Sequence, residues 1–256
     1  MKNYFRKNWK FLLFVLLGGL IGGYCIGLYS YDSLSEDTLA LLQEQNATRD
    51  LIALSSMVQY GIVFGVVLAT IGILFSEKIH LWKSFQPNRK AILMTSIISV
   101  FSALCLFPGD TLIFGSLNEW VRSQYTQSPT IWKILGGLLV GGIIEEVMMR
   151  LFFMSLCVLL ISVIFFKKRK EIPVSVYVIS NIIAAILFAA GHIPSTMTMT
   201  SLTPVILIRC FLFNGGLGLA FGHLYRKYGI GYAMIAHGLA HLISDILMMW
   251  ICSYMN

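Results

Sequence analysis

The sequence predicts an all-α protein, a polytopic transmembrane bundle of about seven helical spans. Three observations predict this fold class. The 256 residues are 57% hydrophobic and 12% charged, whereas a soluble domain carries roughly a quarter charged residues. Apolar runs long enough for helical spans recur along the whole chain. Lys and Arg residues gather in short clusters between alternate runs.

The apolar runs place the spans. A span needs about 20 apolar residues, so the third run is short and the fourth is long enough for about one and a half crossings. The polar residues 30–52 are expected to form a short exposed helix. We divide the chain into N-terminal transmembrane helices and loops, 1–130, and a helical core, 131–252, within one integral membrane domain. The predicted spans are 11–29, 53–76, 91–107, 131–165, 174–192, 203–223 and 231–252.

The basic clusters predict the orientation. Loops rich in Lys and Arg stay in the cytoplasm, so we expect a cytoplasmic N-terminus in a protein of the plasma membrane. The net charge of +7 then reports topology and contact with the lipid bilayer, and we predict no nucleic-acid partner. The basic clusters are 2–10, 78–90, 167–170 and 226–227. The loops poor in Lys and Arg are 30–52, 108–130 and 193–202.

The fourth span contains the charged stretch "EEVMMR". An ionisable residue in a span is costly and usually faces the bundle interior for a functional reason. Glu146 and Arg150 are four residues apart, so they share a helix face and can neutralise each other. Glu145 is rotated by about 100° from that face. A desolvated carboxylate without a cationic partner is a stronger base, which makes Glu145 the candidate general base. The alternative is an ion-pair cluster that only orients helices.

Polar side chains also mark the fifth and last spans. His192 ends "FAAGH" and lies four residues after Phe188, although a lone His at a helix end is more often a boundary residue than a catalyst. His237, His241 and Asp245 follow one another at intervals of four and form one stripe on one helix face. The stripe belongs either to a site or to a hydrogen-bond ladder between helices.

The polar groups also raise the question of metal binding. Glu145, His192, His237 and His241 carry donor atoms that zinc accepts, but there is no HExxH motif. We predict no metal and no cofactor, with zinc as a minority alternative.

Counting residues places Glu145 and His241 near the middle of the membrane and His192 near an outer end. These groups can meet only if span five is shifted, tilted or broken, or if span four is bent. His223 is expected to be interfacial and without a role.

Taken in chain order, the EExxxR, FxxxH and final HxxxH motifs resemble the CPBP family of intramembrane endopeptidases. This family includes the type II CaaX prenyl proteases and bacteriocin-immunity-type membrane proteins. The resemblance covers roughly residues 130–250. It implies a metal-independent glutamate protease in which Glu145 activates a water molecule and His192 helps to hold it.

The same resemblance implies the remaining roles. Glu146 and Arg150 resemble a supporting pair, Phe188 resembles a residue that shapes the pocket, and His237 resembles a donor to the oxyanion. The chain departs from the family at His241, where Asn or Asp is usual. Our hypothesis is that an N–H group of His241 donates to the oxyanion as an Asn amide would, with Asp245 fixing the tautomer.

We therefore predict an intramembrane endopeptidase that hydrolyses a peptide bond of a membrane-associated protein or peptide. Two alternatives stay open. The first is a non-catalytic immunity or regulatory protein of the same fold. The second is an ion- or proton-coupled transporter, which is less favoured because the spans show no inverted repeat.

Overall fold

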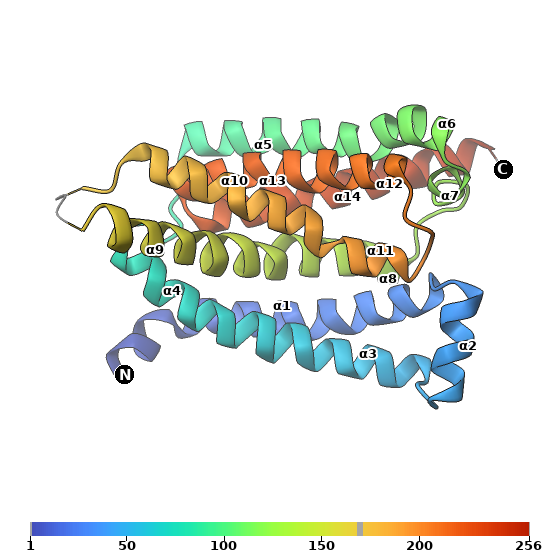
Figure 1. Cartoon of the computed structure of the whole chain (residues 1–256), viewed down its shortest axis with the longest axis horizontal. Coiled ribbons are helices and arrows are strands. Elements are labelled where there is room, and N and C mark those ends of the chain that lie inside the picture. The colour runs from blue at the N-terminus through green and yellow to red at the C-terminus, as the bar shows by residue number, and fades with distance from the viewer. Residues whose placement is uncertain (1, 168–170, 256) are drawn as a thin grey trace.

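The structure is a computed structural model that describes residues 2–167 and 171–255. Every regular element within these ranges is a helix (Figure 1). Seven helical segments are long and apolar enough to cross a membrane. They confirm the predicted fold class and the seven predicted spans, of which the fourth has the predicted bounds and the other six run longer. The segments are Arg6–Asp32, Arg49–Lys78, Arg89–Leu117, Ile131–Phe165, Val174–Met197, Pro204–Tyr228 and Ile230–Tyr254.

Most spans combine α-helical and π-helical segments, the latter denoted η. In the first half of the chain the elements are α1 Lys2–Asp32, α2 Glu36–Glu44, α3 Arg49–Val58, η1 Gln59–Val67, α4 Leu68–Lys78, α5 Arg89–Leu104, η2 Cys105–Phe114, α6 Gly115–Leu117 and α7 Glu119–Ser123. In the second half they are α8 Ile131–Gly136, η3 Gly137–Glu145, η4 Val147–Met154, α9 Ser155–Phe165, α10 Val174–Gly191, α11 Ile193–Met197, α12 Pro204–Cys210, η5 Phe211–Gly215, α13 Gly216–Tyr228 and α14 Ile230–Met255.

Side-chain caps explain where many helices begin. An N-cap oxygen accepts a hydrogen bond from a backbone N–H that has no partner within the helix. Such caps start α2, α3, α5, α8 and α12, and α2 is the exposed helix predicted within 30–52. The capping residues are Ser35, Thr48, Asn88, Thr130 and Thr203.

The third span differs from the prediction. We expected it to be short and to end at residue 107, before Pro108 and Asp110, but η2 continues it through both residues to α6. The Asp110 side chain is fully buried and accepts hydrogen bonds from Arg209 Nε at 2.8 Å and from Tyr125 Oη at 2.6 Å. The Asp110 charge in this extension of the span is thus neutralised inside the bundle.

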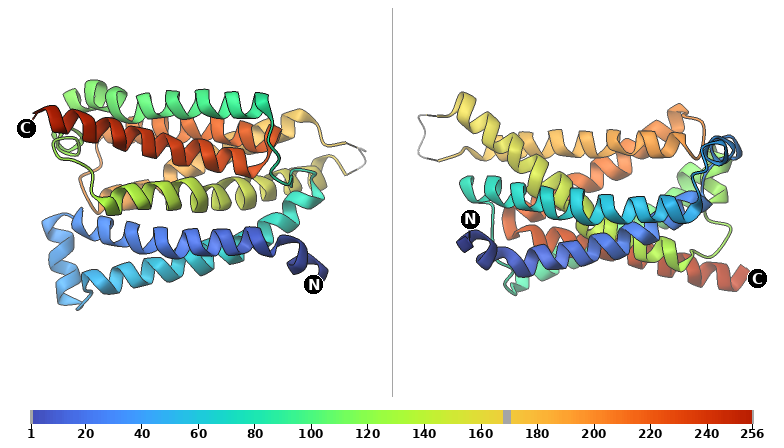
Figure 2. Two further views of the ribbon diagram at one scale, coloured as in Figure 1. Left: turned by 180° about the vertical axis from the view of Figure 1, so that it is seen from behind. Right: turned by 90° about the horizontal axis from the view of Figure 1, so that it is seen from below.

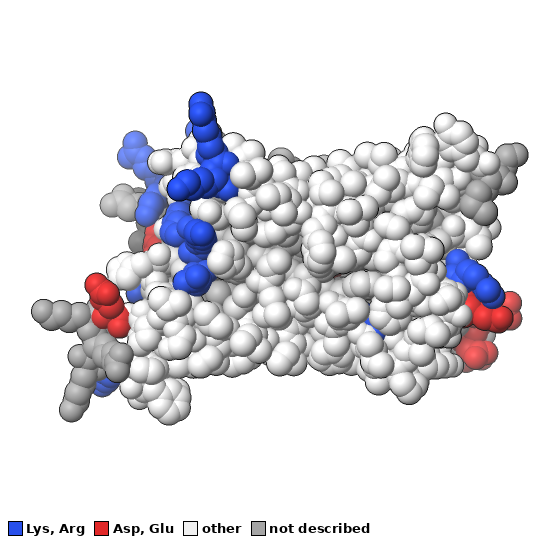
Figure 3. Space-filling view, turned by 90° about the horizontal axis from the view of Figure 1, so that it is seen from above, with Lys and Arg blue, Asp and Glu red and all other residues white. Residues whose placement is uncertain are grey.

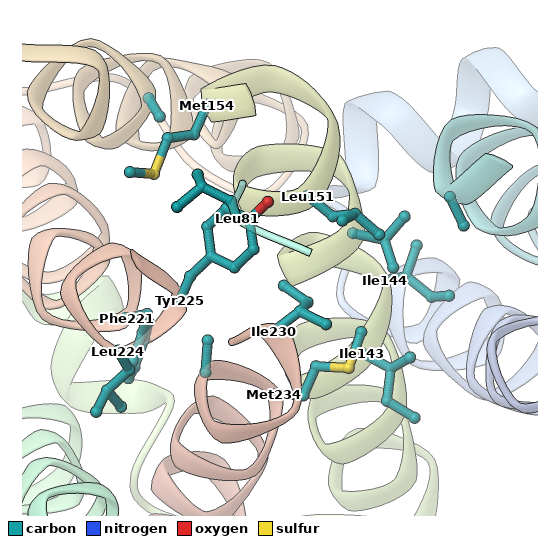
Figure 4. Close-up of a cluster of buried hydrophobic side chains, with 14 of the residues drawn as sticks. Leu81, Ile143, Ile144, Leu151, Met154, Phe221, Leu224, Tyr225, Ile230 and Met234 are labelled. Atoms are coloured by element: carbon teal, nitrogen blue, oxygen red, sulfur yellow. The ribbon is translucent and has the colours of Figure 1, made fainter. Parts of the chain in front are cut away.

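The fourth span lies at the centre of the bundle. It contacts α1 and α4 on one side and α10, α13 and α14 on the other. Figure 1 shows α1, α3 and α4 forming one layer, with α5 on the opposite outer face, and Figure 2 shows the same order from behind. Side chains of the fourth span, α13 and α14 converge in the hydrophobic core (Figure 4). The labelled residues of this core are Leu81, Ile143, Ile144, Leu151, Met154, Phe221, Leu224, Tyr225, Ile230 and Met234.

The two ends of the bundle differ in charge. Lys and Arg side chains gather at one end, whereas acidic side chains are prominent at the other (Figure 3). The end that carries the α4–α5 and α13–α14 connections is called the basic end here. The order of basic and acidic connections agrees with the predicted alternation, although Lys168, Arg169 and Lys170 of one predicted cluster lie outside the described residues.

Glycines bring η3 against α14. A Cβ atom on Gly142 would lie 2.7 Å from Gly238 Cα, and one on Gly141 would lie 2.9 Å from His241 Nε2. Small residues allow such close helix contacts in membranes.

We expect Gly142→Ala to destabilise the fold by about 1–3 kcal/mol through overpacking, measured as a lower thermal unfolding midpoint in detergent. Gly191→Ala is the matched control, because an added Cβ there meets no described atom within 4 Å beyond its chain neighbours and the adjacent backbone of its own helix. Equal midpoints for the two variants would contradict the close packing.

Candidate active site

A buried ion pair lies in the middle of the fourth span. Glu146 Oε1 is 3.1 Å from Arg150 Nη1, and both side chains are buried. This contact confirms the pair that the four-residue spacing predicts. Arg150 Nη2 also donates a hydrogen bond to the carbonyl oxygen of Gly218 at 3.0 Å, and its guanidinium stacks 4.7 Å from the ring centre of Phe188. The pair therefore fixes the fourth span to α13 and α10.

His237 joins this pair from α14. Its Nδ1 lies 2.9 Å from Glu146 Oε1, and its ring stacks on Phe221 with 4.5 Å between ring centres. Because a carboxylate paired with Arg150 only accepts hydrogen bonds, we assign the proton of this contact to His237 Nδ1. The other nitrogen of the neutral ring, Nε2, is then a hydrogen-bond acceptor.

Glu145 faces two imidazoles. Its Oε1 is 3.8 Å from His192 Nε2, and its Oε2 is 3.8 Å from His237 Nε2. His192 Nδ1 lies 2.8 Å from the carbonyl oxygen of Phe188, so this nitrogen is the donor and Nε2 is again an acceptor. The Glu145 side chain is 23% exposed, unlike the fully buried Glu146. Two neighbouring carboxylates thus have different surroundings.

The path of α10 explains how His192 reaches Glu145. This helix runs obliquely across the bundle (Figure 1) and ends at Gly191. His192 is the junction to α11, which extends the same span to Met197. His192 is therefore five residues inside the end of the span. Of the arrangements that the sequence left open, the structure has a fifth span that runs obliquely and is interrupted at His192.

His241 lies beside His237 on the same helix. The two rings stack with 5.1 Å between their centres. Asp245, which we expected to fix the His241 tautomer, instead lies 3.2 Å from Lys133 Nζ, and a hydrogen bond from a His241 N–H to Asp245 is not among the contacts that the structure describes. The physical reason is that α8 contacts α14 and brings an ammonium group to this buried carboxylate. The position of His241 is thus set by stacking and by Gly141 rather than by Asp245.

A small cavity adjoins the histidines. Its volume is about 30 Å³, which is room for a water molecule but not for a side chain of a substrate. The rings of His237 and His241 line this cavity together with side chains that are mainly apolar. The cavity is lined by Leu106, Phe188, Phe213, Asn214, Leu217, Phe221, His237 and His241.

Several contacts at the site were not predicted from the sequence. Phe221 and Gly218 meet His237 and Arg150, and both lie on one face of α13 at three-residue spacing. The small-residue pattern "GGLGLAFG" was the available signal for this face. Lys133 carried no signal, because a lone basic residue at the start of a span reads as a boundary charge.

The donor groups of the site do not assemble into a recognisable metal centre. Among the described residues, no cluster of three or more His, Cys, Asp or Glu side chains is arranged to hold a metal ion. The five cysteines are free thiols. Whether the chain uses a cofactor stays a prediction, and the experiment below includes a chelator for this reason.

Comparison with known proteins identifies one domain of the chain. Residues 126–243 match the family model described as type II CAAX prenyl endopeptidase Rce1-like. These residues form an Rce1-like domain. The match confirms the resemblance that the three motifs indicated, and the Rce1-like domain contains all six predicted catalytic residues. A search of curated proteins and a search of solved structures each found no significant match.

The Rce1-like domain and the seven apolar helices together indicate an integral membrane protein with a function of the CAAX protease type. Such a protein acts on membrane-associated substrates.

Proposed function

We propose that the chain is an intramembrane endopeptidase in which Glu145 activates a water molecule. The observation that carries this proposal is the convergence of one carboxylate and two imidazole Nε2 atoms, with 3.8 Å between Glu145 and each ring. All three groups are hydrogen-bond acceptors in the assignment above. Acceptors that face one another need a donor between them, and a water molecule can donate to Glu145 and to one ring at about 2.8 Å.

The proposed reaction is a direct attack by this water. Glu145 removes a proton as the water oxygen forms a bond to the peptide carbonyl carbon. The protonated Glu145 then gives the proton to the amide nitrogen, the C–N bond breaks, and a carboxylic acid and an amine leave. No covalent intermediate with the protein forms, and water is the only co-reactant.

The geometry favours His241 as the donor to the oxyanion. His237 uses Nδ1–H on Glu146, so its neutral ring presents an acceptor to the site and suits holding water. His241 lines the adjoining cavity and can turn an N–H group toward a developing negative charge. This division of roles differs from the family resemblance, which implies the oxyanion role for His237.

The charged ends support an orientation for this site. The positive-inside rule places the basic end in the cytoplasm, together with the N-terminus. We propose the plasma membrane as the location and a membrane-associated protein or peptide as the substrate. The polarity of the buried site, enclosed within a bundle of apolar helices, favours a peptide segment that reaches it from the membrane.

The test is peptide profiling of membranes with and without the chain, each with and without a chelator. Cleavage products that require the chain and survive chelation support a water-activating carboxylate. Products that disappear on chelation would instead indicate that cleavage requires a metal ion such as zinc. Products that do not depend on the chain would contradict the protease and favour the immunity or regulatory alternative. Ion flux through liposomes that contain the chain would instead support the transporter.

His241 provides a sharper prediction. We expect His241→Asn to keep activity within about three-fold, and His241→Ala to lose about 10²-fold, the usual effect of removing one oxyanion donor. The measurement is kcat on a substrate found by profiling, with thermal unfolding of both variants as the control for folding. Full activity of His241→Ala would show that His241 donates nothing to the reaction.

A further inference from the structure

A second and larger cavity lies outside the candidate active site, between α10 and α13. Its volume is about 300 Å³, at the lower end of the range for small-molecule sites. It shares no lining residue with the cavity at His237 and His241. Its lining residues are Met154, Tyr177, Val178, Asn181, Ile182, Leu219, Gly222, His223 and Arg226.

The walls of this cavity are apolar and open toward the bilayer. Val178, Ile182 and Leu219 are exposed on the outer surfaces of α10 and α13. The buried Met154 lies deeper, at the end of η4. Gly222 has no side chain where α10 comes closest, because a Cβ there would collide with the Asn181 side chain. A hydrocarbon chain is the group that such a wall accommodates best.

Polar groups along the wall already have partners. Tyr177 Oη donates a hydrogen bond to the carbonyl oxygen of Ile79 at 3.1 Å, and Asn181 Nδ2 donates to that of Leu219 at 2.9 Å. Because these two donors are already used within the protein, the polar group of a ligand would bind at the charged mouth of the cavity.

The mouth is cationic. Arg226 is half-buried at the basic end, and within the described part of the chain no acidic side chain pairs with it. His223 lies one turn deeper on α13. Lys83 adds a second cation, since its Nζ donates to the carbonyl oxygens of Arg226 and Lys227 at 3.0 and 2.9 Å. Burial and, to a smaller extent, the nearby Arg226 charge lower the pKa of Lys83.

We propose that this cavity binds one anionic phospholipid of the leaflet at the basic end. An acyl chain lies between α10 and α13 against Val178, Ile182 and Leu219, and the phosphate lies beside Arg226 and His223. Arginine suits this role because its planar fork binds phosphate oxygens through two hydrogen bonds. The polarity of the cavity changes along its length in the same order as that of a lipid, from an apolar wall to a cationic mouth.

The test is native mass spectrometry of the purified full chain titrated with phosphatidylglycerol or with phosphatidylcholine. We expect phosphatidylglycerol to bind preferentially. Arg226→Gln should weaken its binding about five-fold, the usual contribution of one basic residue to anionic-lipid attraction. Leu219→Trp, which fills the apolar wall, should weaken binding without any change of charge. Arg89→Gln is the matched control, because Arg89 is an exposed arginine that starts α5 away from the cavity.

The outcomes separate the possible occupants. Equal binding of the two lipids, or unchanged phosphatidylglycerol binding in both Arg226→Gln and Leu219→Trp, would overturn the proposal. A loss of the same size in Arg89→Gln would show a diffuse surface effect and would also overturn it. The same spectra also show the oligomeric state. If the chain is a dimer and Leu219→Trp disrupts it, the cavity is the contact site of a second copy of the chain, and the lipid proposal is wrong. Neither result depends on proteolytic activity.

Discussion

Glu145→Gln is expected to lower kcat by about 10³-fold, within the usual range for loss of a general base, and to leave the fold intact. The amide has nearly the shape of the carboxylate but cannot take a proton from water. Glu145 contacts two histidines at 3.8 Å and makes no ion pair with a Lys or Arg within the described residues. Its replacement therefore removes no strong partner from a buried charge, and we expect the unfolding midpoint to stay close to that of the wild type.

The measurement is the rate of cleavage of a profiled substrate by protein reconstituted in lipid, together with the unfolding midpoint. Glu171→Gln is the control, because Glu171 is an exposed acid in the connection between α9 and α10. Cleavage by Glu145→Gln at the wild-type rate would remove Glu145 from the mechanism. Loss of cleavage together with a much lower unfolding midpoint would indicate a structural role for Glu145 instead.

The sequence was sufficient for features that depend on one helix at a time. Span number follows from hydropathy, because every backbone group in a bilayer must be bonded within its own segment. The Glu146–Arg150 pair follows from helical spacing and is present at 3.1 Å. The exception was the third span, which continues past its predicted end at residue 107 and includes Asp110. Its partner Arg209 is 99 residues away, and such a distant contact has no local signature.

The candidate site depends on contacts between helices, which sequence spacing does not specify. The motifs identified Glu145, His192 and His237 but not which ring atoms face the carboxylate. The bond from His237 Nδ1 to Glu146 joins residues 91 positions apart, and it is the reason that we propose an acceptor role for His237 in place of the donor role that the resemblance implies. The pairing of Asp245 with Lys133 likewise required knowledge that α8 lies against α14.

Arg150→Met is expected to cause the largest loss of stability of any single substitution considered. It removes the charge that balances Glu146 in a fully buried environment, together with the hydrogen bond to Gly218. Breaking a buried ion pair from one side typically costs about 3–5 kcal/mol, because the remaining charge stays desolvated. The measurement is thermal or denaturant unfolding in detergent. Arg122→Met is the control, since Arg122 pairs with Glu119 at the surface, where such a pair contributes about 0–1 kcal/mol.

The double variant Glu146→Gln with Arg150→Met separates the stabilising and catalytic roles of the pair. Neither charge is then left buried, so we expect it to be more stable than Arg150→Met alone. Proteolysis should remain low, because His237 Nδ1 loses its carboxylate partner and the ring is no longer held with Nε2 toward Glu145. A double variant that recovers both stability and activity would show that the pair serves only the fold. Recovery of stability alone would mean that the two buried charges persist in an apolar span because they orient the histidine that holds the reacting water.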